Sequence, residues 1–130
     1  VWPIDVGPRA GGNMIPDLLG LIFGVDVVEM AILTAMGESI ENKVQKGIPY
    51  YATYNLHTHE NGIFKRIEFS NQIENKIINK YLYKHPGDKV EYFDNAAKVL
   101  GIIFLKFDSF DQMIQMIDEI QKLYKVVLEK

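Results

Sequence analysis

The spacing of apolar and polar positions divides the chain into two parts. Residues 2 to 7 are apolar apart from one acid, which predicts a buried strand. Residues 16 to 23 and 27 to 36 have helical patterns, and Gly24 between them predicts a left-handed stop for the first helix. Asp26 is placed to cap the second helix. The first part is therefore expected to be one strand followed by two helices.

The second of these helices is apolar on nearly every side. Between residues 27 and 36 the polar exceptions are Glu29 and Thr34. A helix without a polar face is typical of the interior of a larger structure. We therefore expect the chain to be a fragment of a longer protein. In isolation it is expected to form a homo-oligomer through this helix and the strand at residues 2 to 7.

In the second part the apolar residues recur with a period of two, which is typical of strands. Residues 50 to 58 and 63 to 69 flank Asn61-Gly62, a strong turn signal, and predict a β-hairpin. A turn centred there pairs Leu56 with Ile67 and gathers apolar side chains on one face.

Four more elements follow the predicted hairpin. Asn71 is expected to start a short helix, and a strand is expected around residues 80 to 84. Residues 99 to 107 are almost continuously apolar, which predicts a central strand covered on both faces. Ser109 is placed to cap a last helix that runs to about residue 127. The predicted class is α+β, with a small sheet and packed helices in the second part.

The segment from residue 5 to residue 16 has the composition of an anion-binding turn. Gly11 and Gly12 allow a positive φ and a close approach to a ligand, and Pro16 fits the first turn of a helix. The free amides of that turn, beside Arg9, suit a phosphate or carboxylate, and Asp5 offers an oxygen ligand for Mg²⁺. The same residues are compatible with a plain glycine-rich turn in which Arg9 is solvated.

Several spaced residues between positions 2 and 38 agree with a single family pattern: Asp5-x-Gly7-Pro8-Arg9-x-Gly11-Gly12-Asn13-x-Ile15-Pro16, then Gly24-Val-Asp26 and Ala35-Met-Gly37-Glu38. This pattern resembles the closing portion of the ATP-grasp fold. It is most similar to the carboxylate–amine ligases and the carbamoyl-phosphate-synthase-like members. On that basis residues 1–48 end an ATP-grasp domain, and residues 49–130 form a C-terminal α+β lobe.

The resemblance implies a ligase that uses ATP and Mg²⁺ to activate a carboxylate as an acyl phosphate, which an amine or ammonia then attacks. Asp5 corresponds to an acidic residue that holds Mg²⁺, and Arg9 to an arginine that faces the transferred phosphate or the carboxylate. The turn of Gly11, Gly12 and Asn13 corresponds to part of the ATP site. The family usually has Glu at position 5 and often Asn at position 7, where this chain has Asp5 and Gly7.

The chain lacks the phosphate-covering lysines and the adenine hinge that this family places earlier. We therefore expect the fragment alone to be inactive and its longer parent to be the enzyme, with small-molecule carboxylate and amine substrates. The alternative function is a non-catalytic α+β domain that binds a small anionic ligand or a protein partner. In a third possibility, the apolar helix at residues 27 to 36 is the docking surface of an interaction module.

Composition narrows these possibilities. The chain has 130 residues, 48% of them hydrophobic, and a net charge of −3. The lysines are scattered among acids, which argues against a nucleic-acid partner. No apolar run approaches the roughly 20 residues that span a bilayer, so no membrane association is expected. The chain has no cysteine, which excludes thiol catalysis and fits a cytoplasmic location.

Two other groups of polar residues carry possible chemistry. His57 and His59 are two apart on a predicted strand, so they share a face and have a spacing that suits a transition metal. The predicted hairpin places Arg66 beside His57, which disfavours a metal there. The aspartates of the C-terminal part are expected to serve in turns and at helix starts: Asp88, Asp94, Asp108 and Asp111.

Overall fold

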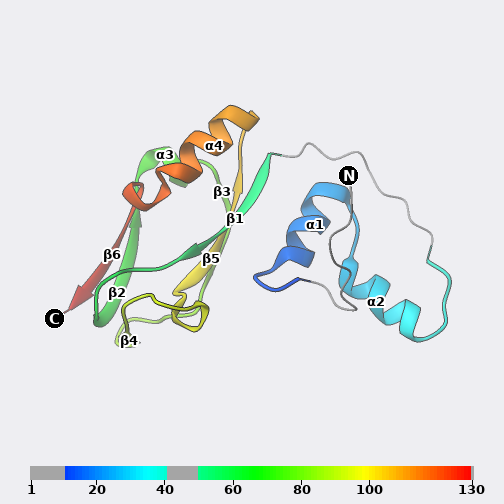
Figure 1. Ribbon diagram of the computed structural model, residues 1–130, viewed down its shortest axis with the longest axis horizontal. Helices are drawn as coiled ribbons and strands as arrows, with labels where there is room; N and C mark the ends of the chain where they lie inside the picture. The colour runs from blue at the N-terminus through cyan, green and yellow to red at the C-terminus, as the bar shows by residue number, and fades with distance from the viewer. Residues whose placement is uncertain (1–10, 41–49, 130) are drawn as a thin grey trace. The chain divides into compact units, whose positions relative to one another are not determined.

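The computed structural model describes residues 11–40 and 50–129, which belong to two compact units that divide after Pro49 (Figure 1). The predicted strand at residues 2 to 7 lies outside the described residues, as do Asp5 and Arg9.

The N-terminal unit contains two short helices, α1 (Ile15–Phe23) and α2 (Val27–Ala35). Gly24 has a φ of 67° and its N–H donates to the carbonyl of Gly20, which confirms the predicted left-handed stop. The carboxylate of Asp26 accepts the N–H groups of Val28 and Glu29 at 3.0 and 2.8 Å, which confirms the predicted cap of α2.

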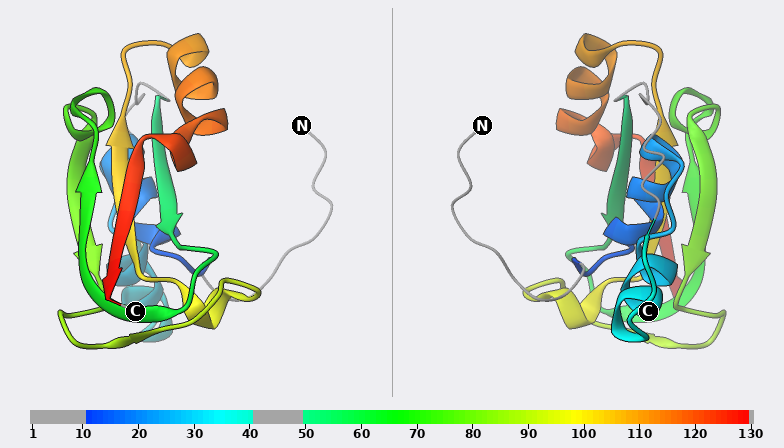
Figure 2. Two further views of the ribbon diagram at one scale, coloured as in Figure 1. Left: turned by 90° about the vertical axis from the view of Figure 1, so that its left-hand side faces the viewer. Right: turned by 90° about the vertical axis from the view of Figure 1, so that its right-hand side faces the viewer.

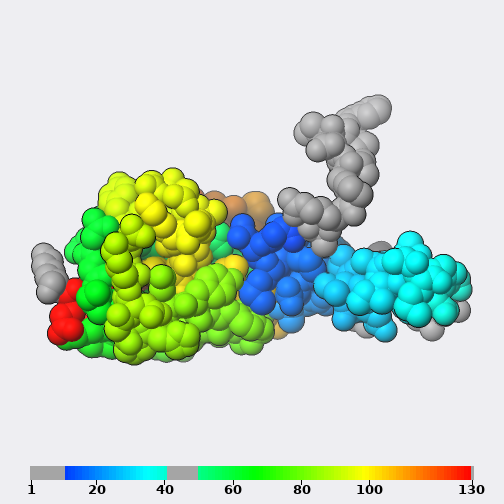
Figure 3. Space-filling view, turned by 90° about the horizontal axis from the view of Figure 1, so that it is seen from below, coloured from blue at the N-terminus to red at the C-terminus, as the bar shows by residue number. Residues whose placement is uncertain are grey.

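Neither α1 nor α2 has a buried residue. On α2 and just beyond it, the apolar side chains of Val28, Ile32 and Met36 are 56%, 55% and 69% exposed. Figure 3 shows α2, in cyan, with a broad accessible surface. Among the described helices none is long and apolar enough alone to cross a membrane; α1 and α2 meet that test of length and composition only as a pair, bent by 104°.

The C-terminal unit is built from two three-stranded antiparallel sheets (Figures 1 and 2). One sheet has the order β1 (Tyr51–Leu56), β5 (Gly101–Lys106), β3 (Ile77–Leu82). The other has the order β4 (Lys89–Val90), β2 (Gly62–Phe69), β6 (Tyr124–Glu129). The helical segments are α3 (Asn71–Glu74), η1 (Ala96–Lys98), α4 (Phe110–Asp118) and η2 (Ile120–Lys122).

The core of this unit combines side chains from both sheets with residues that flank them: Leu56, Phe64, Ile73, Val90, Leu100, Ile103, Leu105, Phe107 and Ile120. Strand β5 is central in its sheet, and its residues from Gly101 to Leu105 are all buried. Successive side chains of a strand point to opposite faces, so both faces of β5 are covered. The predicted central strand is confirmed.

The predicted hairpin is wrong, because β1 and β2 belong to different sheets. Leu56 lies opposite Gly101 of β5, and Ile67 lies opposite Val126 of β6. Gly101 allows β3 to approach closely, since a Cβ there would lie 2.5 Å from the carbonyl oxygen of Tyr81. Strand β5 has a partner strand on each edge. We attribute the observed pairing to this arrangement, which buries more apolar surface than a hairpin around Asn61-Gly62 would bury.

The last helix is shorter than predicted. Ser109 does cap it, accepting the N–H of Gln112 at 3.2 Å, but α4 ends at Asp118. Residues 124 to 129 form β6, whose side chains at 124, 126 and 128 pack against the core. Their period of two fits a strand, and pairing with β2 satisfies the backbone of both.

Two smaller boundaries also differ from the prediction. Helix α3 begins at Asn71, but the residue at its N-cap is Ser70, whose side chain makes no capping bond. Strand β3 begins at Ile77, earlier than the predicted strand around residues 80 to 84.

Candidate functional site

The predicted phosphate-binding residues Gly11, Gly12 and Asn13 form the turn that leads into α1. The carbonyl of Gly12 accepts the N–H of Ile15 at 3.1 Å, which closes the turn immediately before the helix. In this turn positive φ angles lie at Asn13 (54°) and Met14 (58°), and Gly12 is not among the glycines with a positive φ. Asparagine tolerates this region, whereas Met14 adopts it at a cost in strain.

The two glycines differ in their surroundings. A Cβ built on Gly11 would lie 3.0 Å from Cδ1 of Ile15, so this glycine permits close packing against the first residue of α1. A Cβ built on Gly12 would meet no atom within 4 Å. Gly12 is exposed, and its backbone is open to an incoming group. Of the two, Gly12 therefore has the space that a phosphate needs to approach the backbone.

The N-terminus of α1 carries no side-chain cap. Its N-cap residue, Met14, has no side chain able to accept a hydrogen bond, and Pro16 in the first turn contributes no N–H. The N-terminus of α2 differs, because Asp26 accepts two of its amides. In the first turn of α1 the N–H of Ile15 donates to the carbonyl of Gly12, and that of Leu18 donates to the carbonyl of Met14. Among the described residues, the N–H of Asp17 is therefore the amide of this turn that has no partner and can meet an external acceptor.

Asp17 also lies in the first turn of α1, and the sequence analysis did not single it out. A carboxylate at this position interacts favourably with the helix dipole but repels an anion bound to the same turn. A phosphate bound there needs a compensating positive charge. Arg9 and Mg²⁺ are the predicted sources of that charge, and Arg9 lies outside the described residues.

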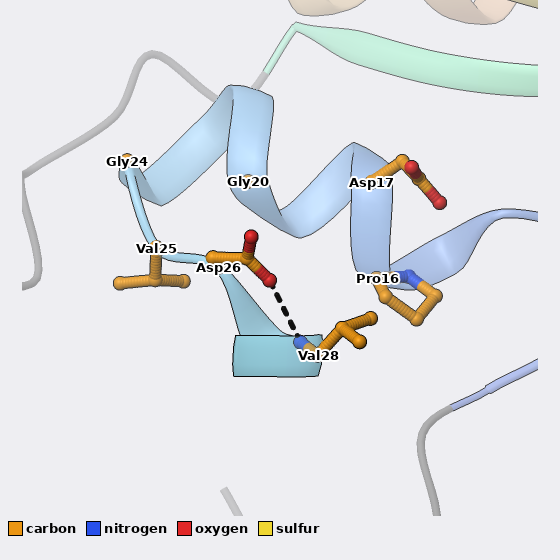
Figure 4. A pocket seen from close by; sticks show the side chains of 7 residues that line it. All are labelled: Pro16, Asp17, Gly20, Gly24, Val25, Asp26 and Val28. Atoms are coloured by element: carbon orange, nitrogen blue, oxygen red, sulfur yellow. Dashed lines mark hydrogen bonds between the residues drawn. The ribbon is translucent and has the colours of Figure 1, made fainter. Parts of the chain in front are cut away.

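A pocket of about 310 Å³ lies between α1 and α2 (Figure 4). Its lining includes the two acidic residues Asp17 and Asp26. The dashed line in Figure 4 marks the hydrogen bond that the N–H of Val28 donates to the carboxylate of Asp26. Two acids make this pocket unsuitable for a phosphate alone. The remaining residues that line it are small or apolar: Pro16, Gly20, Gly24, Val25 and Val28.

The four aspartates singled out in the C-terminal unit make turn, helix-start or lysine contacts. The carboxylate of Asp88 accepts the N–H of His85 at 2.7 Å in a tight turn. Hydrogen bonds from Lys98 and Lys76, with oxygens at 2.8 and 2.5 Å, hold the pKa of Asp94 and of Asp108 below the usual range. Asp111 lies in the first turn of α4. In residues 11–40 and 50–129, no group of three His, Asp or Glu side chains is placed to hold a metal.

Comparison with solved structures gives two chains of the same fold. A phosphoribosylglycinamide synthetase from Anaerococcus prevotii has a TM-score of 0.67 and 23% identity, over 93% of this chain and 32% of that chain. An L-amino acid ligase from Bacillus licheniformis has a TM-score of 0.72 and 15% identity, over 94% of this chain and 31% of that chain. No protein-family model and no curated protein sequence matches the chain.

The likeness to these two structures shows the fold of the chain, an α+β fold that is found in part of each of them. The comparison confirms the resemblance at the level of fold. The chain spans about a third of the length of each of these ligases.

Proposed function

We propose that this chain is the C-terminal part of an ATP-dependent ligase that joins a carboxylate to an amine. The observation that carries the proposal is structural similarity to two ligases over more than nine tenths of the chain. The remaining two thirds of each similar ligase have no counterpart in this chain, and we propose that the full-length protein has such regions. In this proposal such regions supply most of the nucleotide site, and the chain supplies one side of it.

The turn before α1 is the part of the described chain that fits a phosphate. Gly12 leaves space above the backbone, and the first turn of α1 has no side-chain cap. These two features are those of a helix start that receives an anion from outside the chain. Gly11 has a different role in this proposal, because its missing Cβ is needed for packing against Ile15.

Charge explains why the metal and the arginine belong to the same proposal. Asp17 places one negative charge in the first turn of α1, and this charge repels a phosphate that has no bound cation. Asp5 is assigned to Mg²⁺, which carries two positive charges to the phosphates. Arg9 is assigned to the transferred phosphoryl group or the substrate carboxylate, which a planar guanidinium holds through two parallel hydrogen bonds.

When bound, Mg·ATP supplies the γ-phosphoryl group that converts a carboxylate into an acyl phosphate, from which an amine later displaces phosphate. This chain would contribute groups that orient the carboxylate and groups that neutralise the charge of the phosphates. In this proposal Arg9 would hold the carboxylate or the transferred phosphoryl group, and the N–H of Asp17 in the first turn of α1 would donate to an oxygen on which charge develops. The Gly12 backbone keeps that approach free of side chains.

An isotope experiment on the full-length protein that contains this chain tests the reaction class. The protein receives Mg·ATP, hydroxylamine as the amine, and in turn each of the common amino acids labelled with ¹⁸O in the carboxylate. Amino acids are the first probes because one of the similar structures is an L-amino acid ligase. We expect a hydroxamate, ADP and inorganic phosphate that carries one ¹⁸O atom from the carboxylate.

Two results would overturn the proposal. Transfer of the label to AMP would indicate an acyl adenylate and a different class of enzyme. Absence of nucleotide turnover with every amino acid, and with an added panel of dicarboxylates and hydroxy acids, would favour a non-catalytic binding domain. Omission of hydroxylamine is the control, because an amine-dependent ligase then forms no hydroxamate.

A further inference from the structure

Two of the three histidines lie together at the end of β1, in the connection that crosses from one sheet to the other. The ring centroids of His57 and His59 are 5.5 Å apart, and the rings are edge to face. The cation predicted beside them is elsewhere, because Arg66 lies opposite Val127 of β6 and forms an ion pair with Glu68. The electrostatic argument against a metal at these histidines is therefore removed.

The hydrogen bonds of His57 fix which ring nitrogen is available. Its Nδ1 lies 2.8 Å from the carbonyl oxygen of Asn55. A carbonyl only accepts, so Nδ1 carries the proton and Nε2 has the free lone pair. An imidazole held to a backbone carbonyl in this way is typical of metal-binding histidines, because the bond fixes the tautomer and the ring orientation.

The lone pair of His57 Nε2 faces the side-chain amide of Gln121, which also bonds the hydroxyl of Tyr54. Without a metal, the amide donates a hydrogen to this nitrogen. A half-turn of the amide exchanges its NH₂ for its oxygen, and an outward shift of the exposed Gln121 side chain makes room for a metal between that oxygen and Nε2. Gln121 then adds a candidate oxygen donor to those of the two imidazoles.

The separation of the two rings fits a shared metal. Zinc binds imidazole nitrogen at about 2.0–2.1 Å, and the ring centroid lies about 1.1 Å behind that nitrogen. Two imidazoles at a tetrahedral angle then have centroids about 5 Å apart. The observed 5.5 Å is close to this value, so the separation of the two rings is compatible with a shared metal.

The surrounding structure holds the two histidines in place. The hydroxyl of Tyr124 donates to the carbonyl of His57 at 2.8 Å and accepts its N–H at 3.2 Å. The ring of Phe93 packs on the ring of His57 with centroids 4.3 Å apart. The backbone N–H of Phe93 donates to the carbonyl of Thr58. Tyr92 lies against His59 at 5.0 Å. A ligand site built on such supports loses little conformational freedom on binding.

We propose that His57 and His59 bind a divalent first-row transition metal, with the amide oxygen of Gln121 as a third ligand and water in the remaining position. Imidazole nitrogen with one oxygen suits zinc and copper and not Mg²⁺. The site lies in the C-terminal unit, and it does not depend on the proposed ligase activity.

Titration of the tag-free 130-residue chain with Zn²⁺, followed by calorimetry and by the ring resonances of its three histidines, tests the site. His59→Gln removes one ligand from an exposed residue, and His85→Gln is the matched control at an exposed turn. We expect one Zn²⁺ per chain, perturbed rings of His57 and His59, at least tenfold weaker binding for His59→Gln, and unchanged binding for His85→Gln.

Gln121→Leu distinguishes a third ligand from a bystander, and it is expected to weaken binding severalfold while the fold is retained. The proposal is overturned by absence of Zn²⁺ binding below millimolar concentration. It is also overturned if His59→Gln and His85→Gln lose the same amount of Zn²⁺ affinity, or if Zn²⁺ shifts the ring resonances of His85 alone. Co²⁺ offers a spectroscopic check, since an intense visible band would indicate the four-coordinate geometry assumed here.

Discussion

The two units of this chain differ in how their structure is specified. The N-terminal unit has two helices with well-defined ends and no buried residue in either. The C-terminal unit has a core of nine buried side chains drawn from both of its sheets and from flanking segments. Local signals at helix ends are sufficient for the first, whereas the second depends on contacts between residues far apart in sequence. Stability and the proposed chemistry therefore lie in different parts of the chain.

Truncation of the core should produce the largest effect on stability. Leu105 is fully buried in β5 and belongs to the core cluster. Leu105→Ala is expected to lower the free energy of unfolding of the C-terminal unit by about 2–5 kcal/mol, because a cavity remains where the side chain was. Urea unfolding followed by circular dichroism measures this loss.

The matched position in the N-terminal unit is Ile32 on α2, which is 55% exposed. Ile32→Ala should change the free energy of unfolding by less than about 0.5 kcal/mol in the 130-residue chain, as expected for a surface site. A loss similar to that of Leu105→Ala would mean that another surface covers α2. The contrast between the two units would then not hold.

The sequence predicted the ends of elements better than their pairing. Gly24, Asp26 and Ser109 act as expected because a cap involves residues only three or four apart. The pairing of β1 with β5 joins residues about 50 positions apart, and no local pattern encodes it. The turn signal at Asn61-Gly62 was strong, yet the burial of β5 between two partners was decisive.

Loss of a helix cap should have a smaller effect than loss of core. Asp26→Ala removes the acceptor for two amides of α2 and is expected to destabilise the N-terminal helices by about 0.5–2 kcal/mol. Ser70→Ala is the matched control, because the buried hydroxyl of Ser70 has no partner among the described residues. Amide hydrogen exchange should show faster exchange in α2 for the first variant and no change in α3 for the second.

The proposed site was predicted only in part. Residues 11 to 14 do form a turn into a helix, and the open space over Gly12 agrees with the prediction. The positive φ angles at Asn13 and Met14 were missed, because glycine is the usual residue in that conformation. Asp17 was missed because an acid in the first turn of a helix is ordinarily structural.

The smallest expected effect is a change in how protein stability depends on pH, and it arises from the phenol group of Tyr124. Burial raises the pKa of Tyr124, whose hydroxyl is bonded on both sides to the backbone of His57. The unfolded chain loses this proton near pH 10, while the folded protein retains it. The stabilising contribution is therefore complete below pH 10 and declines as the pH rises above it. Urea midpoints between pH 9 and pH 11 should fall more steeply for the wild type than for Tyr124→Phe.

Tyr83→Phe is the control for that measurement, because Tyr83 is 52% exposed and has an ordinary aqueous environment. Its unfolding midpoints should follow the wild type at every pH. If the urea midpoints of the wild type and of Tyr124→Phe change with pH in parallel, the role assigned to Tyr124 is contradicted. In that role its buried hydroxyl joins β6 to the end of β1.

The central claim is that the N-terminal segment carries the chemistry of a ligase, and the two arginines of the chain allow a direct test. In the full-length protein, Arg9→Lys is expected to lower turnover by about 10²-fold or more, because a planar two-point contact becomes a single point charge. Arg66→Lys makes the same chemical change at an exposed ion pair on β2 and should leave turnover within about twofold. Near-normal turnover of Arg9→Lys at saturating substrate would contradict the account.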